Sequence, residues 1–156
     1  MPAQDHESVR LRIQQHEHEC RGRGIITQST AKTLVDHAIN EAPRECCGII
    51  FPRYSITMTI LTFLTNISPN PEREFLIDHQ EYLDACERAG ESPIALYHSH
   101  PTGPATPSVT DCRLMDALEV CKLTLAMVII GLHPPMVRVF EKRDHVYAKI
   151  EEVCVE

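Results

Sequence analysis

The segment ALYHSHP places His98 and His100 one residue apart at the end of an apolar run. Successive side chains of a β-strand point to opposite faces, so a strand here would direct both imidazoles to one face and Ser99 to the other. Pro101 and Gly103 follow and end the strand, which leaves the histidine pair at its tip. Two imidazole nitrogens placed in this way can bind one metal ion, although such a pair is more often satisfied by local hydrogen bonds.

A serine and an aspartate follow the histidines at a spacing typical of a helix start. Ser108 precedes Asp111 by three residues, and this S-x-x-D pattern is a capping box with Ser108 as the N-cap. Capping alone would explain the pair. Together with His98 and His100, however, Asp111 would complete a set of two neutral nitrogens and one carboxylate. Three such ligands leave a fourth tetrahedral position for water, which is the arrangement of catalytic zinc sites.

Glu45 is the candidate base for a hydrolytic site of this kind. Such a site needs a group that takes a proton from the attacking water, and a carboxylate can do this. Glu45 stands in PRECCGIIF, after a proline that ends the preceding helix and before an apolar strand. Considered alone, it is more simply explained as a surface glutamate at the start of a strand.

Hydrophobic periodicity and turn residues predict the elements that would position these side chains. Ser29 or Thr30 is expected to cap the first helix and Asp78 the second, with Gly90 beyond the second helix's end. The expected helices occupy residues 30–43, 77–90 and 108–122, and the expected strands occupy residues 46–52, 55–67, 92–100, 125–131, 136–142 and 145–153.

The order of these elements favours an α+β fold. Helices and strands are mixed without a strict βαβ rhythm, and the last three strands follow one another as a meander. We therefore expect a mostly antiparallel sheet flanked by helices. A chain of 156 residues fits one domain, expected at residues 25–156 behind a polar N-terminal arm, residues 1–24.

The composition limits the compartment and the partners. The formal net charge of −7 argues against a nucleic-acid partner, which would require a basic face. The N-terminus has no apolar signal region, and the longest apolar run, residues 123–132, is far shorter than the ~20 residues that span a bilayer. The seven cysteines are odd in number and fit reduced thiols. We expect a cytoplasmic protein without a membrane segment.

The candidate residues together resemble the signature of the JAMM/MPN (JAB domain) zinc metalloproteases, which reads E…H-S-H-P…S-x-x-D. The segment PRECCGIIF is similar to the family's P-x-E-x-C-G segment, and NISPNPEREFLIDHQEYLDACERAGES resembles prokaryotic and phage members, including lambda-type tail assembly proteins. The resemblance covers roughly residues 28–141. It implies a single MPN/JAMM domain of the cytidine-deaminase-like type.

The resemblance implies a role for each matching residue. His98, His100 and Asp111 would be the ligands of a Zn²⁺ ion. Glu45 would be the general acid/base that takes the proton of the attacking water and gives it to the leaving amine. Ser108 would donate a hydrogen bond to the tetrahedral oxyanion.

The resemblance also implies a substrate class. The expected reaction is hydrolysis of a peptide or isopeptide bond after the extended C-terminal tail of a ubiquitin-like or sulfur-carrier protein. Residues 55–65 are a candidate edge strand that could pair with such a tail by β-augmentation. The residues after Asp111 are expected to complete the same sheet.

Three other hypotheses remain open at this stage. A catalytically silent MPN scaffold or phage tail-assembly component would have the same fold without hydrolysis. A cysteine enzyme would use Cys46 or Cys47 with a histidine such as His133, although thiols in an apolar strand tend to be buried and inert. The sequence HEHEC at residues 16–20 offers a separate metal-binding arm, for which a solvated tail is the simpler explanation. Oligomeric state is not indicated.

Overall fold

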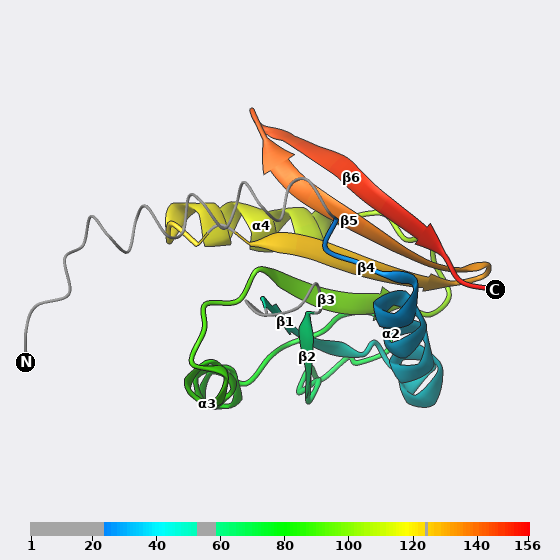
Figure 1. Cartoon of the computed structure of the whole chain (residues 1–156), viewed down its shortest axis with the longest axis horizontal. Helices are drawn as coiled ribbons and strands as arrows, with labels where there is room; N and C mark the ends of the chain where they lie inside the picture. Colours follow the sequence, from blue (N-terminus) through cyan, green and yellow to red (C-terminus); the bar gives the residue numbers. More distant parts are fainter. Residues whose placement is uncertain (1–23, 53–58, 124) are drawn as a thin grey trace, which may run out of the picture.

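The computed structural model describes residues 24–52, 59–123 and 125–156, which form one six-stranded sheet with helices on both faces (Figure 1). The predicted α+β class is confirmed. In chain order the elements are α2 (Gln28–Glu41), β1 (Cys47–Phe51), β2 (Ile60–Leu64), α3 (His79–Ala89), β3 (Ala95–His100), α4 (Val109–Val120), β4 (Ala126–Leu132), β5 (Pro135–Arg143) and β6 (Val146–Cys154).

The sheet has the strand order β2-β1-β3-β4-β5-β6. Neighbouring strands are antiparallel except for β3 and β4, which are parallel. A parallel pair needs a long crossover connection, and α4 lies in that connection. The mostly antiparallel sheet and the β4–β5–β6 meander agree with the sequence-based expectation, and β2 and β6 form the two edges.

Capping residues set the helix starts. Helix α2 begins earlier than predicted, because Thr27 is its N-cap and accepts a hydrogen bond from the Thr30 backbone N–H at 3.1 Å. The prediction of Ser29 or Thr30 as the cap was therefore wrong: Thr27 already supplies the capping oxygen, so Ser29 and Thr30 lie in the first turn of the helix. For α3 the predicted cap Asp78 and the left-handed Gly90 at the C-terminal end are confirmed.

The strand expected at residues 55–67 is shorter in the structure. Strand β2 covers Ile60–Leu64, and residues 53–58 lie outside the described part of the chain. Beyond β2 the chain leaves the sheet, and Asn66 forms an isolated antiparallel bridge with Ile77. The intervening segment folds back toward the start of β1, where Glu45 lies, since the Glu45 N–H donates to Pro71 O.

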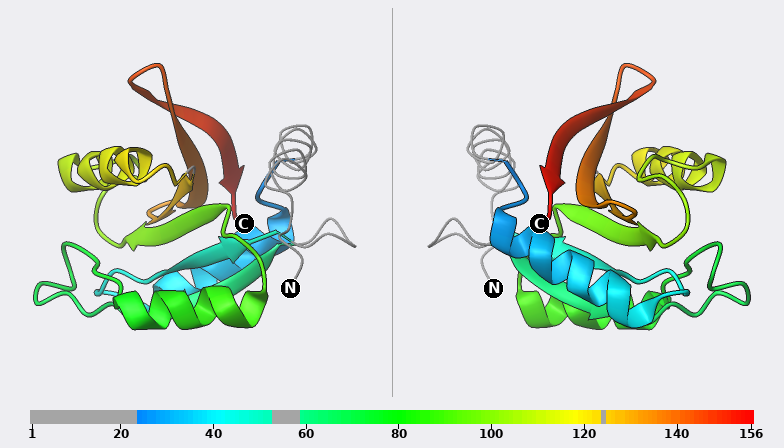
Figure 2. Two further views of the ribbon diagram at one scale, coloured as in Figure 1. Left: turned by 90° about the vertical axis from the view of Figure 1, so that its left-hand side faces the viewer. Right: turned by 90° about the vertical axis from the view of Figure 1, so that its right-hand side faces the viewer.

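The two faces of the sheet are covered by different helices. Helix α2 packs on one face, against apolar residues that include Tyr97 and Val128, and α3 and α4 pack on the other, where Leu96 and Ile129 lie. Figure 2 shows α2 behind the sheet in one view and in front of it in the other. By strand alternation, His98 shares the α3/α4 face with Leu96. No helix among the described residues is long and apolar enough to cross a membrane.

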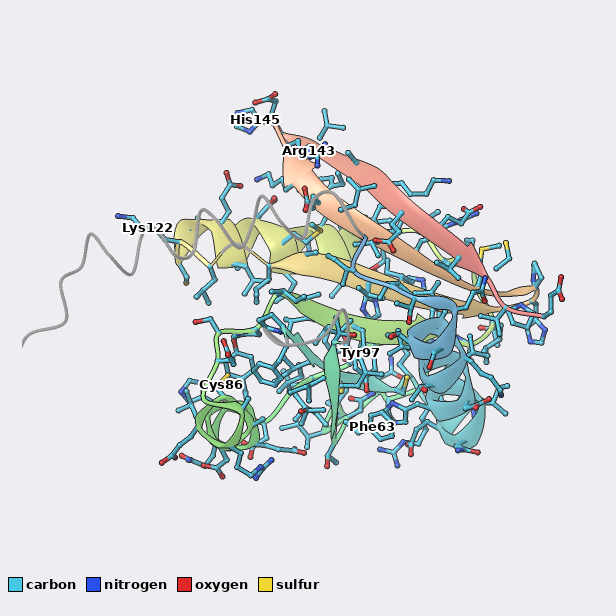
Figure 3. All side chains as sticks on the ribbon, viewed as in Figure 1. Phe63, Cys86, Tyr97, Lys122, Arg143 and His145 are labelled. Atoms are coloured by element: carbon cyan, nitrogen blue, oxygen red, sulfur yellow. The ribbon has the colours of Figure 1, made fainter. Side chains whose placement is uncertain are left out.

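Gly48 permits close contact between β1 and a bulky side chain of β3. Gly48 pairs with Tyr97, and a Cβ at this position would lie 2.4 Å from the Tyr97 ring and 2.4 Å from the Thr62 carbonyl oxygen. The Tyr97 ring extends toward α2, where its hydroxyl lies 3.0 Å from His37 Nδ1 (Figure 3). The glycine of the C-C-G segment thus lets β1 pack against β3, which carries the histidine pair.

Candidate metal centre

Three of the predicted site residues converge where β3 ends and α4 begins. The Nε2 atoms of His98 and His100 lie 3.0 Å apart at the tip of β3. Asp111, in the first turn of α4, places Oδ1 3.0 Å from His98 Nε2 and Oδ2 3.1 Å from His100 Nε2. The ligand atoms of the three residues all lie within 4.8 Å of one another. Strand alternation and the helix start therefore bring together the side chains that the sequence singled out.

Burial and mutual hydrogen bonding shift the pKa values of the three groups. Burial lowers the pKa of His98, which is fully inaccessible, although hydrogen bonding to Asp111 opposes the shift. Burial also opposes protonation of His100, but hydrogen bonds to Asp111 and to the Pro104 carbonyl outweigh it and raise its pKa. Burial disfavours ionised Asp111 too, yet hydrogen bonds from His100 and His98 hold its pKa well below the usual range. The carboxylate is thus ionised beside two imidazoles.

The donor set fits a divalent cation such as zinc. His100 Nδ1 lies 2.8 Å from the Pro104 carbonyl oxygen, which can only accept, so Nδ1 carries a proton. Protonated His100 donates from Nε2 to Asp111 Oδ2, whereas neutral His100 directs the Nε2 lone pair at this acceptor, and the two lone pairs repel. A cation would relieve this repulsion. Ligand atoms bound tetrahedrally to zinc at 2.0–2.1 Å lie about 3.3 Å apart. The two Nε2 atoms are 3.0 Å apart, and each lies 3.0–3.1 Å from one of the two Asp111 carboxylate oxygens, so the separations are close to this value.

Ser108 caps α4 and keeps its hydroxyl proton available. Its Oγ accepts a hydrogen bond from the Asp111 backbone N–H at 3.1 Å, and its own N–H donates to Asp111 Oδ2 at 2.9 Å. The predicted capping box is confirmed. Because the cap uses only a lone pair of Oγ, the hydroxyl of Ser108 can still donate to a group in the adjacent cavity. The capping and donor roles are therefore compatible.

Glu45 lies two residues before the first residue of β1 and lines the same cavity as the candidate ligands. The cavity has a volume of about 240 Å³. Glu45 is only 6% exposed, and its backbone N–H donates to Pro71 O at 2.7 Å. The cavity is lined by Glu45, Glu72, Arg73, Glu74, Phe75, His100, Pro101, Thr102, Gly103, Ser108, Thr110 and Asp111.

The environment of Glu45 suits proton transfer near neutral pH. Burial raises the pKa of its carboxyl group to about 7; the charge of His100 opposes the shift, and Asp111 and Glu74 add to it. A carboxyl group that titrates near the working pH is an efficient general base and acid. Perturbed carboxyl groups in a cavity are also a recognised mark of functional sites.

The raised pKa of Glu45 predicts a stability gain for Glu45→Gln in the metal-free protein. A folded-state pKa above the unfolded value means that the folded state loses stability as pH rises from about 4.5 to about 7. Glutamine carries no such penalty. At pH 8 Glu45→Gln should therefore raise the free energy of unfolding by about 3–4 kcal/mol, at about 1.4 kcal/mol for each pKa unit between about 4.5 and about 7, and by less than about 1 kcal/mol at pH 5.

Urea denaturation in the presence of a chelator measures this difference. Glu72→Gln is the matched control, since Glu72 lines the same cavity but is exposed, and it should change stability little at either pH. Equal stability of wild type and Glu45→Gln at pH 8 would show that the Glu45 carboxylate is not penalised by burial.

Ser99 joins the histidine strand to the segment that carries Glu45. Its side chain is fully buried and points away from the candidate ligands, as strand alternation predicts. Ser99 Oγ accepts from the Cys46 N–H at 2.8 Å, and the Ser99 N–H donates to the Cys46 carbonyl at 3.1 Å. This pair of bonds holds the residue after Glu45 against the middle of the H-S-H segment.

Two residues beside the site were not singled out from the sequence. Phe75 stacks on the His98 ring, with centroids 4.4 Å apart, and Asn66 donates from its buried side chain to the Glu45 carbonyl. Both lie in the stretch NISPNPEREF, whose prolines and asparagines predict only a turn. Within the described chain, His98 Nδ1 is the one buried side-chain polar atom without a hydrogen-bond partner.

The buried thiols disfavour the cysteine-nucleophile hypothesis. Cys46 and Cys47 are 2% and 0% exposed. Burial raises the pKa of Cys46 to about 11 and that of Cys47 to about 12, so neither supplies a thiolate at neutral pH. The HEHEC sequence at residues 16–20 lies outside the described residues.

The fold and the site together define a JAB-type domain: H-S-H at a strand tip, S-x-x-D at a helix start and a glutamate before the adjacent strand. Residues 27–142 match the family described as prokaryotic homologs of the JAB domain. The chain belongs to this family, and the resemblance predicted from the motifs is confirmed.

Curated relatives share the matched region. A probable TtuB-protein conjugate cleaving protease of Thermus thermophilus is 37% identical over 94 residues, which cover 58% of this chain and 59% of the relative. Tail tip assembly protein K of Escherichia phage N15 is 32% identical over 59% of this chain and 36% of the relative. A desampylase of Haloferax volcanii is 32% identical over 47% of this chain and 56% of the relative. The matches thus span less than two thirds of each relative.

A solved structure supports the fold. The solution structure of protein DSY2949 from Desulfitobacterium hafniense aligns with a TM-score of 0.62 at 25% sequence identity. The alignment covers 83% of this chain and 90% of that protein. The similarity therefore extends over most of the described sheet and its helices.

Proposed function

We propose that this protein is a zinc-dependent metallopeptidase that hydrolyses a peptide or isopeptide bond after the C-terminal tail of a ubiquitin-like or sulfur-carrier protein. The observation that carries the proposal is the convergence of two imidazoles and a carboxylate beside a cavity that also holds a buried glutamate. The names of two relatives, a conjugate-cleaving protease and a desampylase, support the reaction class.

In this proposal, His98, His100 and Asp111 hold the zinc ion. A bound zinc ion supplies Lewis acidity, which polarises the scissile carbonyl and makes water a nucleophile near neutral pH. His100 is oriented for this task by its Nδ1–H bond to the Pro104 carbonyl, because such a bond fixes the tautomer that leaves Nε2 free for a metal. Asp111 is oriented by the Ser108 N–H.

Glu45 transfers the protons of the reaction, and Ser108 stabilises the negative charge that develops on the substrate oxygen. The Glu45 carboxylate takes a proton from the attacking water and delivers it to the leaving amine, which its near-neutral pKa permits in both directions. Ser108 donates its hydroxyl proton to the oxygen on which negative charge develops. A donor of this type contributes on the order of 3 kcal/mol of transition-state stabilisation.

The outer edge of β2 is the proposed docking place for the substrate tail. Within residues 24–52, 59–123 and 125–156, β2 pairs only with β1, so no described strand covers its other edge, which could accept the tail by β-augmentation. Leu64 at the end of β2 pairs with Cys47, two residues after Glu45, so a tail along this edge would approach the cavity. Phe63 lies on the α2 face of β2, where its ring stacks on His37 with centroids 3.9 Å apart; it is 51% exposed and offers apolar contact to a tail on this edge.

Phe63→Glu is expected to raise KM about tenfold while zinc content and kcat stay near wild type, because Phe63 lies on the α2 face of the sheet, away from the candidate ligands. Val146→Glu is the matched control: Val146 is an exposed apolar residue on the opposite edge strand, β6. Steady-state kinetics with a tailed fusion measures both. An unchanged KM for Phe63→Glu would remove β2 as the docking edge.

The proposed reaction is tested with fusions that carry Gly-Gly tails. Zinc-loaded protein should cleave at the glycine, as seen by mass spectrometry, and activity should disappear with a chelator and return with zinc. A zinc-loaded protein that cleaves no tail would instead favour a catalytically silent scaffold or tail-assembly component, which the likeness to tail tip assembly protein K supports.

We further propose a cytoplasmic setting with a protein partner, and neither a nucleic acid nor a membrane. The six cysteines of the described chain are free, which suits a reducing compartment. The net charge of −7 disfavours binding to phosphate backbones.

A further inference from the structure

We infer that Asn66 is a positioning residue for Glu45: its buried carboxamide ties the segment from Asn66 to Ile77 to the Glu45 backbone and so sets where the glutamate carboxylate lies in the cavity. The inference rests on the proposed acid/base function of Glu45. Asn66 does not line the cavity and would act only through Glu45.

No hydrogen bond among the described residues fixes the Glu45 side chain. Its carboxylate accepts no hydrogen bond from any residue in the described part of the chain, so its position depends on the backbone. Glu45 also precedes β1, so the sheet does not hold it through strand pairing. Instead its N–H donates to Pro71 O at 2.7 Å, and its carbonyl accepts from Asn66 Nδ2 at 3.0 Å. Both backbone groups of Glu45 therefore bond to the Asn66–Ile77 segment.

The Asn66 carboxamide is used on both its donor and its acceptor sides. The residue is 7% exposed, so each unmet bond would leave a buried polar group unsatisfied. A carboxamide side chain supplies two N–H donors and a carbonyl oxygen acceptor together. The Nδ2 group donates to Glu45 O at 3.0 Å, Glu74 O at 3.0 Å and Pro71 O at 3.4 Å, and Oδ1 accepts from Ser68 N at 3.0 Å and Leu76 N at 3.1 Å.

The same segment also contacts the candidate metal ligands. Phe75 stacks on His98 at an interplanar angle of 24°. Glu74, whose carboxylate accepts from Ser68 Oγ at 3.0 Å, lines the cavity. A segment closed by Asn66 thus contacts Glu45 on one side and His98 on the other. Its loosening would change the position of the base relative to the ligands.

The test compares Asn66→Ala, Asn66→Asp and the control Asn70→Ala in zinc-loaded protein. Asn70 is an exposed asparagine of the same segment whose side chain makes no hydrogen bond to other described residues. Asn66→Asp keeps an acceptor for Ser68 N and Leu76 N but loses the donated bonds. Misplacement of a catalytic group by about 1 Å costs on the order of 100-fold in rate. Both Asn66 variants should therefore lose about 100-fold in kcat, with KM and zinc content near wild type, and Asn70→Ala should lose nothing.

Hydrogen exchange of the Glu45 backbone amide, followed by NMR, is the second readout and does not require activity. Its N–H bonds to Pro71, so exchange should be at least about tenfold faster in both Asn66 variants and unchanged in Asn70→Ala. If wild type cleaves no tail, the proposed function fails, and exchange alone decides the role of Asn66.

The inference would be overturned if the Glu45 amide of Asn66→Ala exchanged at the wild-type rate. It would also be overturned if wild type is active and Asn66→Ala has the same kcat. A joint loss of zinc, KM and kcat would also overturn it, because it would show a general structural role. If Asn66→Ala does not fold, Asn66→Asp gives the same comparison. If neither variant folds, Asn66 has a general structural role, and the inference is again overturned.

Discussion

Glu45→Gln is expected to abolish hydrolysis while zinc and the fold are retained. The amide is nearly isosteric with the carboxyl group but cannot accept the proton of the attacking water. General acid–base catalysis is worth about 10²–10⁴-fold, so the loss of kcat should be about 10³-fold or more. Zinc content should not change, because Glu45 is not among the three residues whose ligand atoms converge.

The measurement is cleavage of a Gly-Gly-tailed fusion by zinc-loaded protein, with metal content determined on the same sample. Glu72→Gln serves as the control, since it removes one carboxylate from the same cavity and Glu72 makes no hydrogen bond to the Glu45 backbone. Cleavage by Glu45→Gln at the wild-type rate would disprove the acid/base assignment. Because the same variant should be more stable without metal, a loss of activity through unfolding can be distinguished from a loss of chemistry.

The local parts of the site were predictable because short-range rules determine them. Alternation along a strand is sufficient to place His98 and His100 on one face and Ser99 on the other. The capping box is sufficient to place Asp111 in the first turn of α4, with its carboxylate directed back toward the helix start. The turn after β3 then needs only to connect the two.

The position of Glu45 depends on which strand lies beside β3, and no local rule gives that. Cys47 pairs with His98 because β1 is inserted between β2 and β3 in the sheet. Hydrophobic patterning predicts that the strand exists but not its neighbour or its register. The motif resemblance, rather than periodicity, was what linked Glu45 to the histidines.

Asn66 could not be predicted for a related reason. An asparagine near prolines is typical of an exposed turn, and its own sequence neighbourhood gives no sign of burial. Its role arises from carbonyl groups at 45, 71 and 74 that meet only in the folded chain. The start of α2 shows the same limit on a smaller scale: capping chemistry predicted Ser29 or Thr30, but the neighbouring Thr27, which has the same capping chemistry, is the cap.

Asp111→Asn is expected to remove most of the metal affinity without removing the helix cap. Asparagine still offers an oxygen to the Ser108 N–H, so α4 should begin at the same residue. The negative charge that faces both imidazoles disappears, and a neutral amide is a much poorer ligand for a divalent cation. Loss of a group that merely hydrogen-bonds to a metal ligand costs about 10–100-fold in metal affinity, so loss of the charged ligand itself should cost more than about 100-fold.

Competition with a chromogenic chelator measures the affinity, and circular dichroism checks that α4 is retained. Asp116→Asn is the matched control: it removes one negative charge from the same helix, at a residue that bonds Tyr147 and Lys142 instead of the histidines. It should bind zinc as wild type does. His98→Ala should also lose zinc, since it leaves two of the three ligands, fewer than the three-residue set of a catalytic site. Wild-type zinc affinity in Asp111→Asn would mean that the metal is held elsewhere, and the proposed hydrolytic chemistry would lose its centre.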